Sequence, residues 1–226
     1  MKNNEELQKD VQEAIKWEPL LKAAEIGVIA ENGVITLTGT VDCYPKKIGA
    51  ESAAKNVSGV KAVVEKIDIK FNGIGKKTDK EIADEVLHAF KWHWQIPSEQ
   101  IEIKVENGWV YLQGKVHWNY QREAVTKAIR NLRGLKGVSN EICIQSEVED
   151  KVEKYSIERA LSRSASVDGK GIHVIVTGNS VILTGTVYSL VQKGEAARIA
   201  WSAPGVVSVN NELAIRYKNK LSDLIE

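Results

Sequence analysis

The chain contains little of what would fix it by covalent links or hold it in a membrane. Two of its 226 residues are cysteine, Cys43 and Cys143, which is too few for a disulfide framework, and free cysteine is usually a small buried side chain. No apolar run approaches the ~20 residues that a membrane-spanning helix needs. Its 31 Lys and Arg against 30 Asp and Glu leave a net charge of +1, without the basic excess of a nucleic-acid-binding protein. We therefore expect a soluble protein with no transmembrane segment and no nucleic-acid partner.

Signals of enzymatic chemistry are also absent from the sequence. There is no Ser/His/Asp arrangement, no phosphate-binding loop, no dinucleotide-binding fingerprint and no recurring pair of carboxylates. His88 and His93 do not share a helix face with metal-ligand spacing, and no Cys or acidic residue completes a set with His117. The sequence therefore predicts a non-enzymatic protein with no metal site and no cofactor.

The N-terminal segment gives an expectation about the compartment. Residues 1–7 are polar and acidic and contain no apolar core of signal-peptide length. We therefore expect the protein in the cytoplasm, and the initiating Met1 favours this. The periplasm is the alternative if a signal peptide preceded this numbering.

One pattern does fill the chain, because a ten-residue segment of alternating character occurs three times. Residues 32–41 read NGVITLTGTV, residues 107–116 read NGWVYLQGKV, and residues 178–187 read GNSVILTGTV. The glycine near the end of each segment gives repeat lengths of 75 (114 − 39) and 71 (185 − 114) residues. A repeat this long indicates three tandem copies of a small domain, not a solenoid.

Each copy shows the same order of expected elements. A segment with helical period opens the copy, for example with Ile82, Val86 and Phe90 on one face. Residues 101–105 then alternate as a half-buried strand does, and a tight turn leads into a second strand. An alanine-rich helix (124–132 in the second copy) and a third alternating strand (138–144) complete the copy.

This order predicts an α+β fold made of three tandem αββαβ domains. The hairpin strands should be antiparallel, and the last strand should run parallel to the second through a right-handed crossover. Each domain would be a small mixed three-stranded sheet with two helices on one face. We place the domains at residues 1–72, 76–147 and 150–218, followed by a C-terminal tail at 219–226.

Glycine recurs at three places in the copies, and we assign these glycines structural roles. The hairpin turns, at residues 32–33, 107–108 and 178–179, need the positive φ that Asn and Gly accept. Inside the second strand we expect a helix to pack directly over the glycine. After the alanine-rich helix the glycine is expected to be a C-cap. The structural glycines are Gly33, Gly39, Gly59, Gly108, Gly114, Gly134, Gly185 and Gly205.

Together these motifs resemble the BON domain, a family named for bacterial osmotically inducible and nodulation proteins. The resemblance covers about residues 5–217 and includes the hairpin with its Gly-x-Val close, the alanine-rich helix and a final Gly-Val-x-x-Val-x-Asn-x-Leu/Ile. The Asn of that final motif is matched by Asn140 and by Asn210 or Asn211, whereas the first copy has Glu65. The resemblance implies a non-enzymatic binding role at the bacterial envelope, commonly with anionic phospholipid and often in stress responses.

Aromatic and basic residues of the second copy are candidates for contact with a lipid surface. Trp and Tyr favour the headgroup depth of a membrane, and Lys and Arg are attracted to anionic headgroups. Trp92 aligns with Trp17 (92 − 75 = 17) and is interpreted as structural. Packing at domain junctions and a solvated helix face are the alternatives for the rest. The predicted lipid-contact residues are Trp94, Trp118, Tyr120, Arg122, Lys127, Arg130 and Arg133.

Three functions stay open at this point. The first is an adaptor or binding protein whose partner is an anionic phospholipid surface. The second is a cytoplasmic sensor of potassium or another monovalent cation, because the resemblance includes a potassium-sensing relative. The third is a repeat scaffold whose partners are proteins.

Overall fold

The computed structural model describes residues 3–71, 73, 76–145 and 152–216. The expected tail at 219–226 lies outside these residues. The first copy contains α1 (Asn4–Lys16), β1 (Ile26–Glu31), β2 (Val34–Val41), α2 (Tyr44–Asn56) and β3 (Ala62–Ile69). The second contains α3 (Asp79–Trp92), β4 (Ile101–Glu106), β5 (Trp109–Val116), α4 (Asn119–Ile129), β6 (Gly137–Asn140) and β7 (Cys143–Ile144). The third contains α5 (Lys154–Arg163), β8 (Ile172–Thr177), β9 (Ser180–Val187), α6 (Leu190–Trp201), β10 (Ser208–Asn211) and β11 (Ala214–Ile215).

The sheets have the expected topology, which confirms the α+β fold. In the first copy β2 lies between β1, its antiparallel partner, and β3, its parallel partner. The other copies repeat this order around β5 and β9, except that the last strand is divided into β6 and β7, and into β10 and β11. The described helices include none that is long and apolar enough to cross a membrane.

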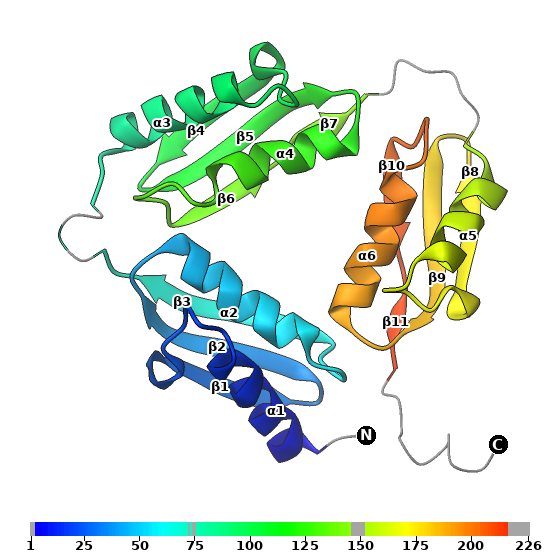
Figure 1. Cartoon of the computed structure of the whole chain (residues 1–226), viewed down its shortest axis with the longest axis horizontal. Helices are drawn as coiled ribbons and strands as arrows, with labels where there is room; N and C mark the ends of the chain where they lie inside the picture. The colour runs from blue at the N-terminus through cyan, green and yellow to red at the C-terminus, as the bar shows by residue number, and fades with distance from the viewer. Residues whose placement is uncertain (1–2, 72, 74–75, 146–151, 217–226) are drawn as a thin grey trace.

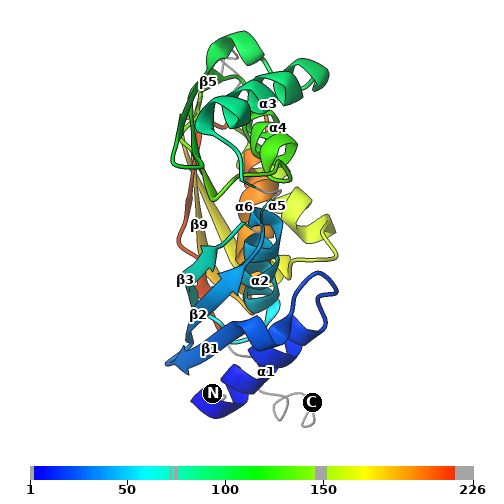
Figure 2. The same ribbon diagram turned by 90° about the vertical axis from the view of Figure 1, so that its left-hand side faces the viewer.

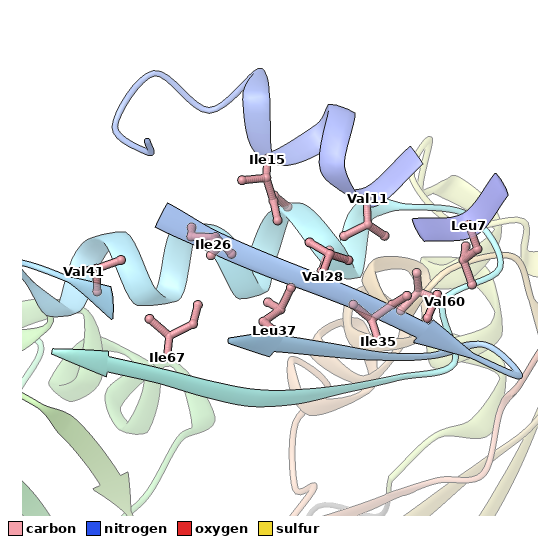
Figure 3. Close-up of a cluster of buried hydrophobic side chains, with 14 residues drawn as sticks. Leu7, Val11, Ile15, Ile26, Val28, Ile35, Leu37, Val41, Val60 and Ile67 are labelled. Carbon is pink, nitrogen blue, oxygen red and sulfur yellow. The ribbon is translucent and has the colours of Figure 1, made fainter. Parts of the chain in front are cut away.

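Each copy has its own apolar core between one face of the sheet and its two helices. In Figure 3, Leu7, Val11 and Ile15 of α1 point toward the sheet, where Val28 and Leu37 meet them. These five residues are at most 5% exposed. The spacing of four residues along α1 puts its apolar side chains on one stripe, so the helical period itself directs them to the sheet.

The glycine inside the second strand is required by the last residue of a short 3-10 helix (Ala23–Glu25, Ser98–Gln100 or Gly169–Gly171) just before the first strand, and not by an α-helix packed over it, contrary to our expectation. A Cβ on Gly39, Gly114 or Gly185 would lie 2.1, 2.1 and 2.0 Å from a backbone carbonyl oxygen just before β1, β4 or β8. The three glycines also have φ of +127°, +139° and +117°, which L side chains rarely adopt. Close backbone approach is therefore the reason for the glycine, as its position in a strand indicates.

The other predicted glycines have positive φ, with two differences in their local structure. Asn32 and Gly33 both have positive φ, as do Asn107 and Gly108, whereas in the third turn only Gly178 does. That turn therefore has the single positive φ of a type II′ hairpin. The glycines expected as C-caps, Gly59, Gly134 and Gly205, follow the last helical residue by three to five positions and lie in the turns beyond the helix ends.

The closing Asn connects the last strand to the second helix. Asn140 Nδ2 donates to the Arg122 carbonyl oxygen at 2.8 Å and to Thr126 Oγ1 at 2.8 Å, and its Oδ1 accepts from the Ile142 amide at 3.1 Å. Asn211 makes the equivalent bonds in the third copy: its Nδ2 donates to the Lys193 carbonyl oxygen at 2.7 Å, and its Oδ1 accepts from the Leu213 amide. Asn211, and not Asn210, is thus the match.

In the first copy an ion pair makes the same connection. Glu65 replaces the Asn, accepts from the Ile67 amide and pairs with Lys47 of α2 at 2.7 Å. Lys47 Nζ also donates to Ile67 O at 3.1 Å. The departure of the first copy from the family motif therefore preserves the link between helix and strand by other atoms.

The copies contact one another through their second helices. Figure 1 shows α2, α4 and α6 facing a common centre, one from each copy. Tyr44 and Ile48 of α2 pack against the core of the second copy, and Leu190 of α6 packs against the core of the first. Between the second and third copies, the Arg122 guanidinium lies 4.7 Å from the ring centroid of Trp201.

These contacts close a ring in which the first copy reaches into the second, the second into the third, and the third into the first. Tyr44 and Leu190 are the first residues of α2 and α6, so two of the junctions use equivalent positions, whereas the printed contact of α4 is made by Arg122, three residues after its first residue Asn119. In the view of Figure 2 the strands lie on the left and the helices to their right, so the three sheets share one face of the ring.

Candidate membrane-contact surface

Four strongly exposed large apolar side chains lie at or just beyond the end of the first helix in the first and second copies. Trp17 is 86% exposed and Leu20 67%, and Trp92 and Trp94 are 78% and 88% exposed. We call these four residues the tryptophan surface. Our interpretation of Trp17 and Trp92 as structural is wrong, because neither is packed in a core.

The helical period explains why these tryptophans point outward. The buried residues of α3 are Ile82, Val86 and Phe90, four positions apart. Trp92 is two positions beyond Phe90, about 200° further around the helix, and so faces away from the sheet. Trp17 is likewise two positions beyond Ile15 of α1. The spacing of the apolar residues in the sequence could therefore have identified both tryptophans as exposed.

A hollow of about 650 Å³ lies beside the exposed side of α3, between this helix and the turn after α4. His88 and Arg133 line it, together with Lys77, Asp84 and Glu85. His88 Nε2 accepts a hydrogen bond from Trp92 Nε1 at 3.1 Å, which connects the hollow to the tryptophan surface. Charges of both signs line the hollow, and Lys77 pairs with Glu85. Because these charges offset one another, the hollow should not strongly select anions.

The predicted lipid-contact residues divide between the two ends of α4. Arg133 lies beyond the C-terminal end of α4 and lines the hollow together with His88. Arg130, at the same end of α4, and Trp94, beyond the end of α3, are both exposed. Trp118 and Tyr120, 36% and 49% exposed, are at the N-terminal end together with Arg122. The structure therefore does not gather the predicted residues into one patch.

The N-terminal end of α4 belongs to the junction with the third copy. Arg122 is half-buried, and this burial lowers the pKa of its guanidinium while Glu123 acts in the opposite direction. Glu123 accepts a hydrogen bond from Asn119 at 2.9 Å and pairs with Lys127 at 3.5 Å. A guanidinium 4.7 Å from a tryptophan ring is in cation–π contact. Arg122 thus has a partner within the protein.

No group of three or more His, Cys, Asp or Glu side chains in the described ranges could hold a metal ion. His88 and Trp92 share a hydrogen bond, and their ring centroids lie 5.9 Å apart with the ring planes tilted by 55°. The Nδ1 atom of His117 lies 3.1 Å from Gln145 O, in another part of the copy. The histidines of the second copy therefore have separate local roles.

Comparison with known proteins identifies the family. The BON domain family matches three segments of the chain, residues 3–70, 78–146 and 154–217. Osmotically-inducible protein Y of Escherichia coli (strain K12) is 30% identical over 158 residues, which is 66% of this chain and 79% of that protein. An uncharacterized protein in the gshII 5′ region of Anaplasma centrale is 30% identical over 118 residues, 51% of this chain and 78% of that protein.

A solved structure also aligns along the chain, although with a low score. CdsD, a structural protein of the type III secretion system of Chlamydia trachomatis, is 16% identical over 97% of each chain, with a TM-score of 0.26. A TM-score this low does not indicate a shared arrangement. The family matches cover most of the sequence and coincide with the three copies of the αββαβ unit. The chain therefore belongs to the BON domain family.

Proposed function

We propose that this chain is a non-enzymatic binding protein that acts in osmotic stress and docks on anionic phospholipid surfaces. The name of the Escherichia coli relative supports the stress role. The observation that carries the membrane role is the tryptophan surface, whose four large apolar side chains are 67–88% exposed. Exposed apolar patches of this kind mark sites of interaction.

The chemistry of these residues fits a membrane interface better than a protein interior. The indole ring combines a large apolar body with one polar N–H, which suits the headgroup region. Arg130, Arg133 and Lys91 are exposed near the end of α4 or on α3. Each cation near an anionic surface contributes about 1 kcal/mol. Insertion of indoles and attraction of the cations would act together.

The ring arrangement favours simultaneous contact by two copies. Trp17 and Trp92 occupy equivalent positions, and equivalent residues of a cyclic assembly lie at similar heights along its axis. Both indoles could then reach one flat surface, and the second contact would be intramolecular once the first had formed. Among the residues indicated by the sequence, Trp94, Arg130 and Arg133 belong to the proposed contact, with Lys127 at its edge. Arg122 belongs to the junction instead, and Trp118 and Tyr120 are its neighbours in the sequence at the start of α4.

Co-sedimentation with vesicles tests this proposal. We expect the protein to bind vesicles that contain phosphatidylglycerol, to bind pure phosphatidylcholine weakly, and to lose affinity as salt screens the charges. Trp92→Ala with Trp94→Ala should reduce binding by at least about tenfold, which corresponds to 1.4 kcal/mol. Wild-type binding by this double variant would refute the assignment of the surface.

A matched variant controls for the loss of an aromatic side chain. Tyr155 of α5 is 68% exposed and lies in the third copy, away from the tryptophan surface. Tyr155→Ala should therefore leave vesicle binding unchanged. The circular dichroism spectra of all variants should match wild type, because the substituted side chains are exposed.

A further inference from the structure

The first residue of the second helix is an equivalent position in the three copies, but its chemistry differs. At the first position of the second helix, the first copy has Tyr44 and the third has Leu190, and both pack into an apolar core. The second copy has Asn119 at this position, although it is only 6% exposed. Four positions further along, the first copy has Ile48 where the second has Glu123. Among the described residues, the second copy is therefore the one with a polar side chain at the first position of its second helix.

The polar junction is held by charges and contains an unsatisfied group. The Arg122 guanidinium contacts the Trp201 ring. The pKa of Arg198 is raised, mainly by its hydrogen bond with Glu195, and Glu123 contributes further from the other side of the junction. Asn119 Nδ2 donates to Glu123, but its Oδ1 has no hydrogen-bond partner in the described part of the chain. A buried acceptor without a partner is more stable when it reaches water.

The contacts at the other two junctions are mainly apolar, so we expect them not to weaken as salt rises. Tyr44 is 9% exposed and its hydroxyl pKa is raised by burial, with a hydrogen bond from the Val138 backbone acting against this. Leu190 contacts the first core, and Ser58 Oγ donates to Tyr188 O at 3.4 Å. Apolar contacts are not screened by ions, whereas interactions between charges are largely screened beyond a Debye length of about 10 Å at 0.1 M salt and about 3 Å at 1 M.

We propose that the ring opens at the junction between the second and third copies when ionic strength rises, with Asn119, Arg122, Glu123 and Trp201 as an electrostatic latch. Rising salt weakens the charged contacts that hold this junction, and opening hydrates Asn119 Oδ1. The two apolar junctions keep the first copy attached to both neighbours. The molecule then changes from a closed ring to an open chain of three domains that exposes Trp201 and the start of α4.

Distances between spin labels test the latch with internal controls. Glu31, Glu106 and Thr177 are exposed, equivalent positions near the ends of β1, β4 and β8. Pairs of these residues are changed to Cys in a chain that carries Cys43→Ser and Cys143→Ser. Between about 0.05 and about 1 M KCl, the 106–177 distance should lengthen and broaden, while the 31–106 pair keeps its distribution. NaCl should act like KCl, and sucrose of equal osmolarity should have no effect.

Two substitutions at the latch give opposite results if the proposal is correct. Asn119→Leu introduces the residue found in the third copy, and it should keep the 106–177 distance short at all salt concentrations. Arg122→Met should give the long distance even at low salt. The latch would be overturned if the 106–177 distance distribution did not change with salt in the labelled chain that keeps Asn119 and Arg122. It would also be overturned if the 31–106 distance changed equally, or if sucrose changed the 106–177 distance. These measurements contain no lipid, so they are independent of the proposed membrane contact.

Discussion

Replacement of Asn140 by Ala tests whether the family's closing Asn joins the second helix to the last strand. The side chain makes two donor bonds of 2.8 Å and accepts one of 3.1 Å. Each buried hydrogen bond contributes about 0.5–1.5 kcal/mol, so its loss should destabilise the second copy by about 2–4 kcal/mol. Asn211→Ala removes two bonds, of 2.7 and 3.3 Å, and should have a smaller effect, about 1–3 kcal/mol.

Urea unfolding followed by circular dichroism measures the free energy, and hydrogen exchange locates the change. Exchange should accelerate in the peptides that contain β6, β7 and α4, and remain at the wild-type rate in the third copy. Asn140→Asp keeps the acceptor for the Ile142 amide but places a carboxylate against the Arg122 carbonyl oxygen, so it should not restore stability at neutral pH. A loss below about 0.5 kcal/mol for Asn140→Ala, or a larger loss for Asn211→Ala, would refute the reasoning.

Three further predictions concern backbone strain, the junction and thiol reactivity. Gly185→Ala should destabilise the third copy by about 2–5 kcal/mol, because φ at this position is +117° and the new Cβ would meet a carbonyl oxygen. A lowered midpoint of thermal unfolding would show this loss. Gly194→Ala, in α6 with no atom within 4 Å of the new Cβ, should instead stabilise it by up to about 1 kcal/mol. Trp201→Ala removes a cation–π contact of up to about 2 kcal/mol and should accelerate hydrogen exchange at the start of α4, and unchanged exchange would contradict the contact. Burial raises the pKa of the Cys43 thiol, so at pH 8 iodoacetamide should modify Cys43 more slowly than the exposed Cys143, as mass spectrometry would show.

The fold could be predicted from the sequence because its signals are local and occur three times. The period of Ile82, Val86 and Phe90 gives the buried face of a helix, and Asn107-Gly108 gives the hairpin turn. The reason for Gly114 could not be obtained in this way. It depends on where the carbonyl of Gln100 lies, just before the neighbouring strand β4, and a sequence does not show that approach.

The candidate site was predicted less well, because a single copy does not show what its neighbours bury. Arg122 is one of several basic residues in and after the second helix of its copy, and the sequence offers no sign that Trp201, 79 positions away (201 − 122), covers it. Trp92 was misassigned for another reason. Its recurrence at position 17 was interpreted as a packing role, although its place off the apolar stripe indicates exposure.

Closure of the ring also affects how the chain responds to damage. In a linear string of domains, the loss of one contact separates the parts on either side, apart from their covalent linker. Here Tyr44 connects the first copy to the second, Leu190 connects the third to the first, and Arg122 connects the second to the third, so each copy has two neighbours. A substitution that breaks one junction leaves a path of contacts through the other two. Two simultaneous failures are needed before any copy becomes an independent domain.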